Sequence, residues 1–234
     1  MKYHYSRVPD IADHRDRYFL AAKPTHRRKV SIIGKDVPIR DQGQLGSCTG
    51  NSAAALVDIV LGVSTRSALM PYYGGRKIEG TVRQDAGAMM RDVMKSISKE
   101  GICSDVMWPY DIKKFKTKPS KAAYLDAATV LPRIMEYQRV DSLDSLKSAL
   151  SEGRPVTFGF SVPEYFEGEA VAKGALVWMP TQNDKMVGGH EVVAVGYDDT
   201  VKTPFIWVRN SWGSSWGING GSATQDVWWM ICGQ

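Results

Sequence analysis

The chain has 234 residues, of which 43% are hydrophobic and 24% are charged, enough for one large domain or two small lobes around real cores. Its longest apolar run, Ala53 to Val63, is interrupted by Asp58 and Gly62. A membrane helix needs about 18 apolar residues, so we expect no membrane association. The net charge of +5 is a mild excess without a nucleic-acid motif, so we expect no nucleic-acid partner either.

Residues 1–36 are polar and irregular, with prolines at positions 9 and 24. They lack a helical or strand period, so they are predicted to form an arm ahead of a domain over residues 37–234. The amino-terminal stretch also lacks the continuous apolar core of a secretory signal peptide. We therefore expect a cytoplasmic location rather than unconventional export.

The first half of the domain is predicted to be helical. Residues 52–61 are apolar and alanine-rich, as expected for a buried helix. A second, amphipathic helix ends at Gly101, because apolar residues recur at i, i+3, i+4 and i+7 in Met90, Val93, Met94 and Ile97. A third, short helix spans residues 142–151. The Pro- and Lys-rich segment 105–135 is predicted to wrap the surface between two lobes.

The second half is predicted to be mainly β-structure. Residues 156–162, 190–198 and 204–212 are rich in β-branched and aromatic residues and are bounded by glycine, proline or aspartate. The pattern predicts an α+β protein with a helical lobe over about 40–130 and an antiparallel β lobe over about 131–234. A cleft between two such lobes is the default place for a site.

Three cysteines, Cys48, Cys103 and Cys232, are too few and too scattered for a disulfide framework or a paired zinc site. We expect no metal and no cofactor. Cys48 lies between a glycine-rich loop and the start of an apolar helix, where backbone N–H groups and the helix dipole stabilise a thiolate. Ser47 or Thr49 would cap that helix. Cys103 and Cys232 are interpreted as inert free thiols, with a bridge between them as the alternative.

A nucleophilic cysteine needs a base, a group that orients the base, and donors for the oxyanion. His190 follows two glycines and opens a strand, whereas the other histidines all lie in the arm. Asn210 stands at the end of a later strand, where its amide would fix the histidine ring. Gln42, together with the backbone N–H of Cys48, would form the oxyanion hole.

Three blocks of sequence carry a resemblance. Residues 41–48 (DQGQLGSC), 189–197 (GHEVVAVGY) and 210–217 (NSWGSSWG) resemble the three signatures of papain-like cysteine proteases, in the same order. His190 lies 142 residues after Cys48, which is within the separation typical of that family, and Asn210 lies 20 residues further on. The resemblance implies a helical left lobe, an antiparallel, β-barrel-like right lobe and an active-site cleft between them.

The resemblance also implies residue roles. Cys48 would be the nucleophile, His190 the acid and base paired with it as an ion pair, Asn210 its orienting group and Gln42 an oxyanion donor. Trp212 resembles the tryptophan that shields the asparagine–histidine hydrogen bond, with simple core packing as the alternative. For substrate binding we expect Gly87, in the stretch 85–88, and also Gly46, Gly189, Glu191 and Trp212.

Two positions depart from the family pattern. Leu45 stands where most members have a disulfide cysteine, so the loop before Cys48 must be held by packing. Glu191 replaces the small residue on the wall of the main specificity pocket. A carboxylate there predicts tolerance for a basic side chain at the second substrate position; alternatively, Glu191 turns to solvent or pairs with a nearby Lys or Arg.

We expect a monomeric endopeptidase that cleaves protein or peptide substrates through an acyl-enzyme thioester. The arm, Tyr3 to Lys29, would either lie across the cleft as an autoinhibitory segment or pack along one lobe. The same machinery would also suit an acyl transferase or isopeptidase. A different alternative is an inactive glycan-binding scaffold that uses an aromatic platform of Trp212, Trp216, Trp228, Trp229, Tyr72 and Tyr73, although the intact set of four catalytic candidates speaks against it.

Overall fold

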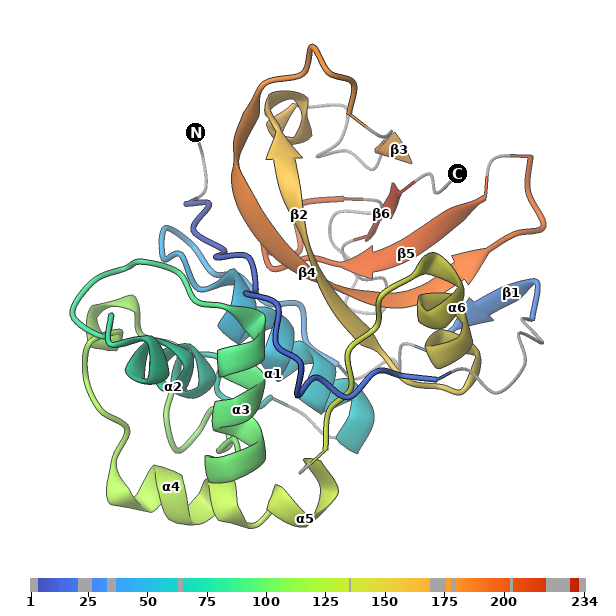
Figure 1. Ribbon diagram of the computed structural model, residues 1–234. Coiled ribbons are helices and arrows are strands. Elements are labelled where there is room, and N and C mark those ends of the chain that lie inside the picture. Colours follow the sequence, from blue (N-terminus) through green and yellow to red (C-terminus); the bar gives the residue numbers. More distant parts are fainter. Residues whose placement is uncertain are drawn as a thin grey trace.

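The computed structural model describes residues 4–20, 27–32, 37–62, 65–134, 136–168, 176–177, 180–202, 204–217 and 228–231. Helices gather in one lobe and a twisted sheet forms the other (Figure 1). This is the predicted α+β arrangement, in which the main helices precede most of the strands in the sequence.

The helical lobe is built on three helices, α1 (Cys48–Leu61), α2 (Leu69–Glu79) and α3 (Met90–Glu100). Shorter elements complete it: the 3₁₀ turn η1 (Ile112–Lys114), α4 (Lys121–Ala128) and α5 (Leu131–Ile134). Its core contains buried side chains from all three main helices, including Val57, Leu69, Tyr72, Val93 and Ile97. The apolar period of α3 faces this core, and Gly101 ends the helix as predicted.

Helix α2 was not predicted, because Pro71 and the pair Gly74-Gly75 interrupt its local helical pattern. Tertiary packing explains the glycines. A Cβ on Gly75 would lie 2.7 Å from Cγ2 of Val93, and one on Gly74 would lie 1.8 Å from the Ser96 hydroxyl oxygen. The close approach of α2 to α3 therefore requires glycine at both positions.

Segment 105–135 also differs from its prediction as a wrapping surface segment. It contains η1, α4 and α5, and Ala123 and Ala127 of α4 are fully buried. The sequence of this short helix has no clear apolar side, so it does not predict an amphipathic helix. The helix is stabilised by packing its alanines against the rest of the helical lobe.

The β lobe is one sheet centred on the long strand β4 (Met186–Asp198). The other strands are β1 (Lys29–Ser31), β2 (Val156–Pro163), β3 (Leu176–Val177), β5 (Phe205–Arg209) and β6 (Trp228–Ile231). Their order is β1-β4-β5-β6-β3, and β2 pairs with β4 as well. Pairing is antiparallel except between β3 and β6, and the described strands do not close into the expected barrel.

Two further helical elements belong to this lobe, namely α6 (Leu143–Ser151) and the 3₁₀ turn η2 (Glu164–Glu167). Ser142 caps α6 by accepting a hydrogen bond from the Ser145 N–H. Leu146 and Leu150 join the β-lobe core with Phe166 and Val192. The apolar side chains of the strands thus pack against the apolar side of α6, and together they form a separate core in this lobe.

Helix α1 joins the two lobes. Ala55 packs against Val193 and Val195 of β4, and the Ser52 hydroxyl donates to the backbone oxygen of Glu191 at 2.9 Å. These contacts hold the first half of α1 beside the middle of β4 (Figure 1).

Among the described helices, none combines the length and apolar content that crossing a bilayer requires.

Candidate active site

Cys48 is the first residue of α1, four positions before the predicted helix start, and its side chain is buried. The backbone N–H groups of Glu191 and Thr49 donate to its sulfur. Ser47 occupies the N-cap position but does not cap with its side chain; its hydroxyl instead bonds the Tyr110 hydroxyl. The nucleophile candidate is therefore held directly against the strand that carries His190.

His190 lies on β4 and is fully buried. Its Nε2 is 2.7 Å from Oδ1 of Asn210, and this oxygen also accepts a bond from the Ser211 N–H at 2.8 Å. Because an amide oxygen can only accept, His190 must carry its proton on Nε2. The buried Nδ1 has no hydrogen-bond partner, so it remains available as a base.

Trp212 lies beside this pair. Its ring centroid is 4.8 Å from that of His190, with an angle of 31° between the planes, and the indole is only 2% exposed. It also packs against Phe166 and Trp216 at centroid distances of 5.2 Å. Trp212 therefore packs against His190 and also belongs to the β-lobe core, so the two predicted roles are compatible.

Gln42 is fully buried. Its Oε1 accepts a hydrogen bond from the Ser211 hydroxyl at 2.6 Å, and its Nε2 donates to the Leu45 carbonyl at 3.1 Å. An amide nitrogen has two N–H groups, and Leu45 takes one of them. The fixed orientation leaves the second N–H for an oxyanion.

The loop before Cys48 is held in two ways. Leu45 is 2% exposed and belongs to the helical core, as its packing role predicts. The Gly46 N–H also donates to the Asp85 carboxylate, at 2.9 Å to Oδ2, and the Tyr72 hydroxyl binds the same carboxylate. Asp85 was not singled out in the sequence, since no local pattern connects it with a residue 39 positions away.

Burial shifts the titration of both reacting groups. It raises the pKa of the Cys48 thiol to about 12, with the nearby Glu191 charge adding to the effect. It lowers the pKa of His190 to about 4, against a smaller opposite effect of the Asn210 hydrogen bond. While the arm covers the site, both shifts act against the ion pair that the helix dipole favours.

The arm covers the cleft. Tyr5 packs at 5.9 Å, between ring centroids, from Trp212, the Ser6 hydroxyl donates to the Gly46 oxygen at 2.9 Å, and the Arg7 N–H donates to the Gly189 oxygen at 3.1 Å. A Cβ on Gly87, where φ is +71°, would lie 1.4 Å from the Ser6 carbonyl oxygen. The structure thus brings the substrate-binding candidates together on one surface, and arm residues 5–7 cover that surface.

Glu191 completes this surface. Its side chain is 1% exposed, and Oε2 accepts from Nε of Arg7 at 3.0 Å. Of the predicted alternative, the orientation toward solvent is wrong, because the carboxylate is buried, whereas the pairing with a nearby basic residue is confirmed by the bond to Arg7.

The predicted aromatic platform is also wrong. Trp212, Trp216 and Tyr72 are at most 4% exposed, so they offer no flat surface to a glycan. Core packing of the β lobe and the helical lobe explains their burial. The side chains of Trp228 and Trp229 lie outside the described residues.

Among the described cysteines, Cys48 and Cys103 are both free and buried. Burial raises the pKa of Cys103 to about 11, which disfavours its reactive thiolate. Cys232 lies outside the described residues. In the described part of the chain, no group of three His, Cys, Asp or Glu side chains is placed to hold a metal ion.

A family profile described as "Papain family cysteine protease" matches residues 27–226. The chain belongs to the papain family of cysteine proteases. The crystal structure of xylellain, a cysteine protease from Xylella fastidiosa, superposes with a TM-score of 0.82 at 36% identity, over 97% of this chain and 88% of that one. The papain fold predicted from the three signature blocks is therefore confirmed.

Two curated relatives are similar over most of the chain. An uncharacterized peptidase C1-like protein of Acanthamoeba polyphaga mimivirus is 38% identical over 82% of this chain and 66% of that protein. Cysteine proteinase 1 of Entamoeba histolytica is 30% identical over 80% of this chain and 59% of its own length. This papain-family chain therefore spans about three fifths to two thirds of the length of these two relatives.

Proposed function

We propose that the chain is a cysteine endopeptidase that hydrolyses peptide bonds in proteins or peptides. The observation that carries the proposal is the orientation of His190. Its Nε2 proton is committed to Asn210 while Nδ1 is buried without a partner, and the Cys48 sulfur is held by the N–H of Glu191, the next residue of the same strand. Membership of the papain family supports the same chemistry.

The reaction begins when Nδ1 of His190 accepts the thiol proton. The Cys48 sulfur then attacks the carbonyl carbon, and the electron pair of the C=O bond moves onto oxygen. Gln42 and the Cys48 backbone N–H donate to this oxyanion. As the C–N bond breaks, Nδ1–H protonates the leaving amine and a thioester remains.

Water completes the cycle. Nδ1 of His190 removes a proton from a water molecule, whose oxygen attacks the thioester carbonyl. The second tetrahedral intermediate collapses by breaking the C–S bond, and the Cys48 sulfur takes the proton back from Nδ1. The products are a carboxylic acid and the regenerated thiol, so the chain's own residues complete the cycle without a redox partner.

The arm would keep this site closed. Residues 5–7 lie against Gly46, Gly189 and Trp212, so a substrate must displace them. Removal of the entire arm would also take Phe19 from the β-lobe core and β1 from the sheet. Point substitutions in the full chain, Tyr5→Ala with Arg7→Ala, release the arm with less damage, and we call this variant the arm-weakened chain.

The test is hydrolysis of a fluorogenic peptide library. We expect the arm-weakened chain to be more active than the wild type, since arm and substrate compete for one surface. Cys48→Ala in the same chain should abolish turnover, and a thiol-directed peptidyl epoxide should label Cys48. The matched control is Cys103→Ala, which should retain both activity and labelling. Absence of hydrolysis in the arm-weakened chain, or labelling at Cys103, would refute the proposal.

A further inference from the structure

The arm places an arginine in a pocket that the body of the protein has built around it. Strands β2 and β4 pair so that Gly159 lies opposite Glu191. A Cβ on Gly159 would lie 2.1 Å from Nε and 2.3 Å from Cζ of Arg7. Glycine at this position therefore leaves the channel through which the guanidinium group reaches Glu191.

The two carboxylate oxygens of Glu191 have different partners. Oε1 accepts a bond from the Thr157 hydroxyl at 2.8 Å, whereas Oε2 accepts from Nε of Arg7 at 3.0 Å. Thr157 and Gly159 both lie on β2 and remain in place when the arm leaves. The body thus holds one oxygen and presents the other to whichever side chain enters the pocket.

Because the Glu191 carboxylate is buried, its ionised form needs a positively charged partner. Burial raises the pKa of Glu191 to about 7, and Arg7 opposes that rise through its charge and its hydrogen bond. An apolar occupant would exclude water without supplying a counter-charge, so the Glu191 carboxyl group would have to take up a proton, which disfavours that occupant above the carboxyl pKa. A basic occupant restores the pair that the arm now makes.

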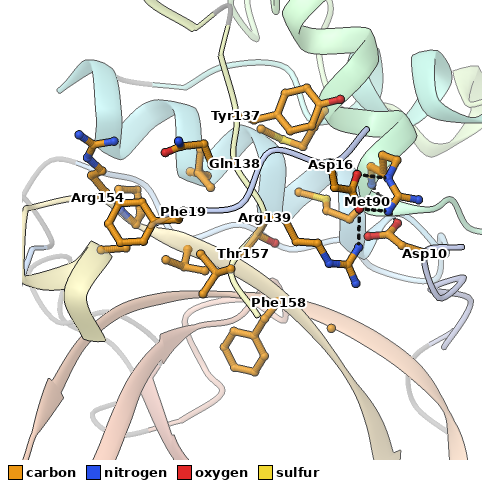
Figure 2. A pocket seen from close by; sticks show the side chains of 18 of the residues that line it. Asp10, Asp16, Phe19, Met90, Tyr137, Gln138, Arg139, Arg154, Thr157 and Phe158 are labelled. Atoms are coloured by element: carbon orange, nitrogen blue, oxygen red, sulfur yellow. Dashed lines mark hydrogen bonds and ion pairs between the residues drawn. The ribbon is translucent and has the colours of Figure 1, made fainter. Parts of the chain in front are cut away.

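The space beyond Arg7 suits a long side chain. A cavity of about 700 Å³ extends from Glu191 between the lobes. Figure 2 shows Thr157 and Phe158 on its β2 side, with Asp10 and Asp16 approaching from the arm. These two aspartates belong to the arm; outside the arm, Glu136 and Glu191 line the cavity, and Glu191 is the one that contacts Arg7.

We propose that Glu191 is a specificity-determining residue that selects substrates with an arginine or lysine side chain in the subsite that Arg7 fills. The inference rests on the proposed peptidase function and names its substrate class. Arg7 is then a built-in competitor, because it pairs with the same carboxylate oxygen that a basic substrate side chain would use. The family resemblance, which places Glu191 on the wall of the main specificity pocket, implies that this subsite takes the second residue before the cleaved bond.

The test compares peptides that differ only at that second residue, with Arg, Lys or Leu. In the arm-weakened full-length chain we expect kcat/KM for Arg to exceed that for Leu by about tenfold to a hundredfold, the range expected of a charged hydrogen bond formed out of water. Glu191→Gln, which has nearly the same shape, should remove the preference. The matched control Glu100→Gln changes the same charge in a pair with Lys77 on the helical lobe and should leave the preference intact.

A binding measurement separates this inference from the proposed catalysis. Full-length Cys48→Ala with Arg7→Ala is titrated with fluorescein-labelled versions of the same peptides and followed by anisotropy. Tighter binding of the Arg peptide, lost in Glu191→Gln, supports the subsite even where no peptide is hydrolysed. Equal binding of the Arg and Leu peptides, or a preference that survives Glu191→Gln, overturns it even where hydrolysis is fast.

A milder variant protects the test from misfolding. Thr157→Val removes only the hydroxyl that fixes Oε1 of Glu191 and should reduce the Arg preference without abolishing it. An unchanged preference in Thr157→Val, together with an unfolded Glu191→Gln, would count against the proposed geometry.

Discussion

At the scale of single residues, reactivity depends on water as much as on neighbouring groups. Cys48 lies at a helix start, which favours a thiolate, and its sulfur is held against the strand that carries His190. Yet under the arm its thiol pKa rises to about 12, because burial removes the solvation that an ion needs. The same burial lowers the His190 pKa to about 4, so both shifts favour the uncharged forms while the arm covers the site.

The raised thiol pKa determines how the alkylation rate of Cys48 depends on pH. A thiol pKa of about 12 leaves about one Cys48 in ten thousand ionised at pH 8. We predict slow alkylation of Cys48 by iodoacetamide in the wild type, with a rate that keeps rising above pH 9. The arm-weakened chain should react faster at pH 7 and level off at lower pH, because water then reaches the sulfur.

Mass spectrometry of each tryptic peptide provides the check, and Cys103 serves as the internal control. Its pKa of about 11 reflects burial in the helical lobe, so the arm substitutions should not alter its rate. Equal alkylation profiles of Cys48 in the two chains would contradict the role of the arm in desolvating the site.

At the scale of elements, the start of α1 is positioned by hydrogen bonds instead of the family disulfide. Asp85 accepts from the Gly46 N–H and the Tyr72 hydroxyl, and it also binds His4 of the arm at 2.8 Å. One carboxylate therefore links the nucleophile loop, α2 and the arm. The charged acceptor makes these bonds stronger than bonds between neutral groups.

We predict that Asp85→Ala, in the arm-weakened chain, lowers kcat about tenfold with a smaller effect on KM. The reason is that a lost bond to a charged group is worth about 1.5–3 kcal/mol, part of which holds the oxyanion loop. Steady-state kinetics measure the change. Asp111→Ala removes an aspartate that caps the exposed turn η1 and should leave kcat unchanged; an equal loss in both variants would exclude the positioning role.

At the scale of the whole molecule, a buried ion pair anchors the segment that connects the lobes. Arg40 donates to Asp58 of α1 at 2.5 Å, and their side chains are 8% and 0% exposed. The Arg66 N–H donates to the other Asp58 oxygen at 2.8 Å. Nearby, Arg209 of β5 donates to the Val37 carbonyl at 2.6 Å. Residues 37–40 are thus tied to one helix and one strand from different lobes.

We predict that Asp58→Ala lowers the free energy of unfolding by about 3–5 kcal/mol, because it leaves the Arg40 charge buried without its partner. Urea denaturation, followed by tryptophan fluorescence, measures the loss. Lys77→Ala breaks the exposed pair with Glu100 and should cost less than about 1 kcal/mol. Similar costs for the two variants would show that the buried pair is not a special anchor.

From the sequence one can predict the family, the order of Cys48, His190 and Asn210, the helix α3 and the β character of the second half. These depend on local signals, namely motif blocks, the helical period and strand alternation. It also marked Glu191 as unusual, but left open whether the side chain faces solvent, a base or a substrate.

Only the tertiary structure decided those questions. The glycines Gly74 and Gly75 of α2 allow α3 to pack closely against it. Asp85 accepts a hydrogen bond from the N–H of Gly46, 39 residues away. Arg7 meets Glu191 across 184 positions of sequence, and burial reverses the titration expected of Cys48. Close approach and loss of water depend on which distant segments fold together, and no local pattern of residues records that.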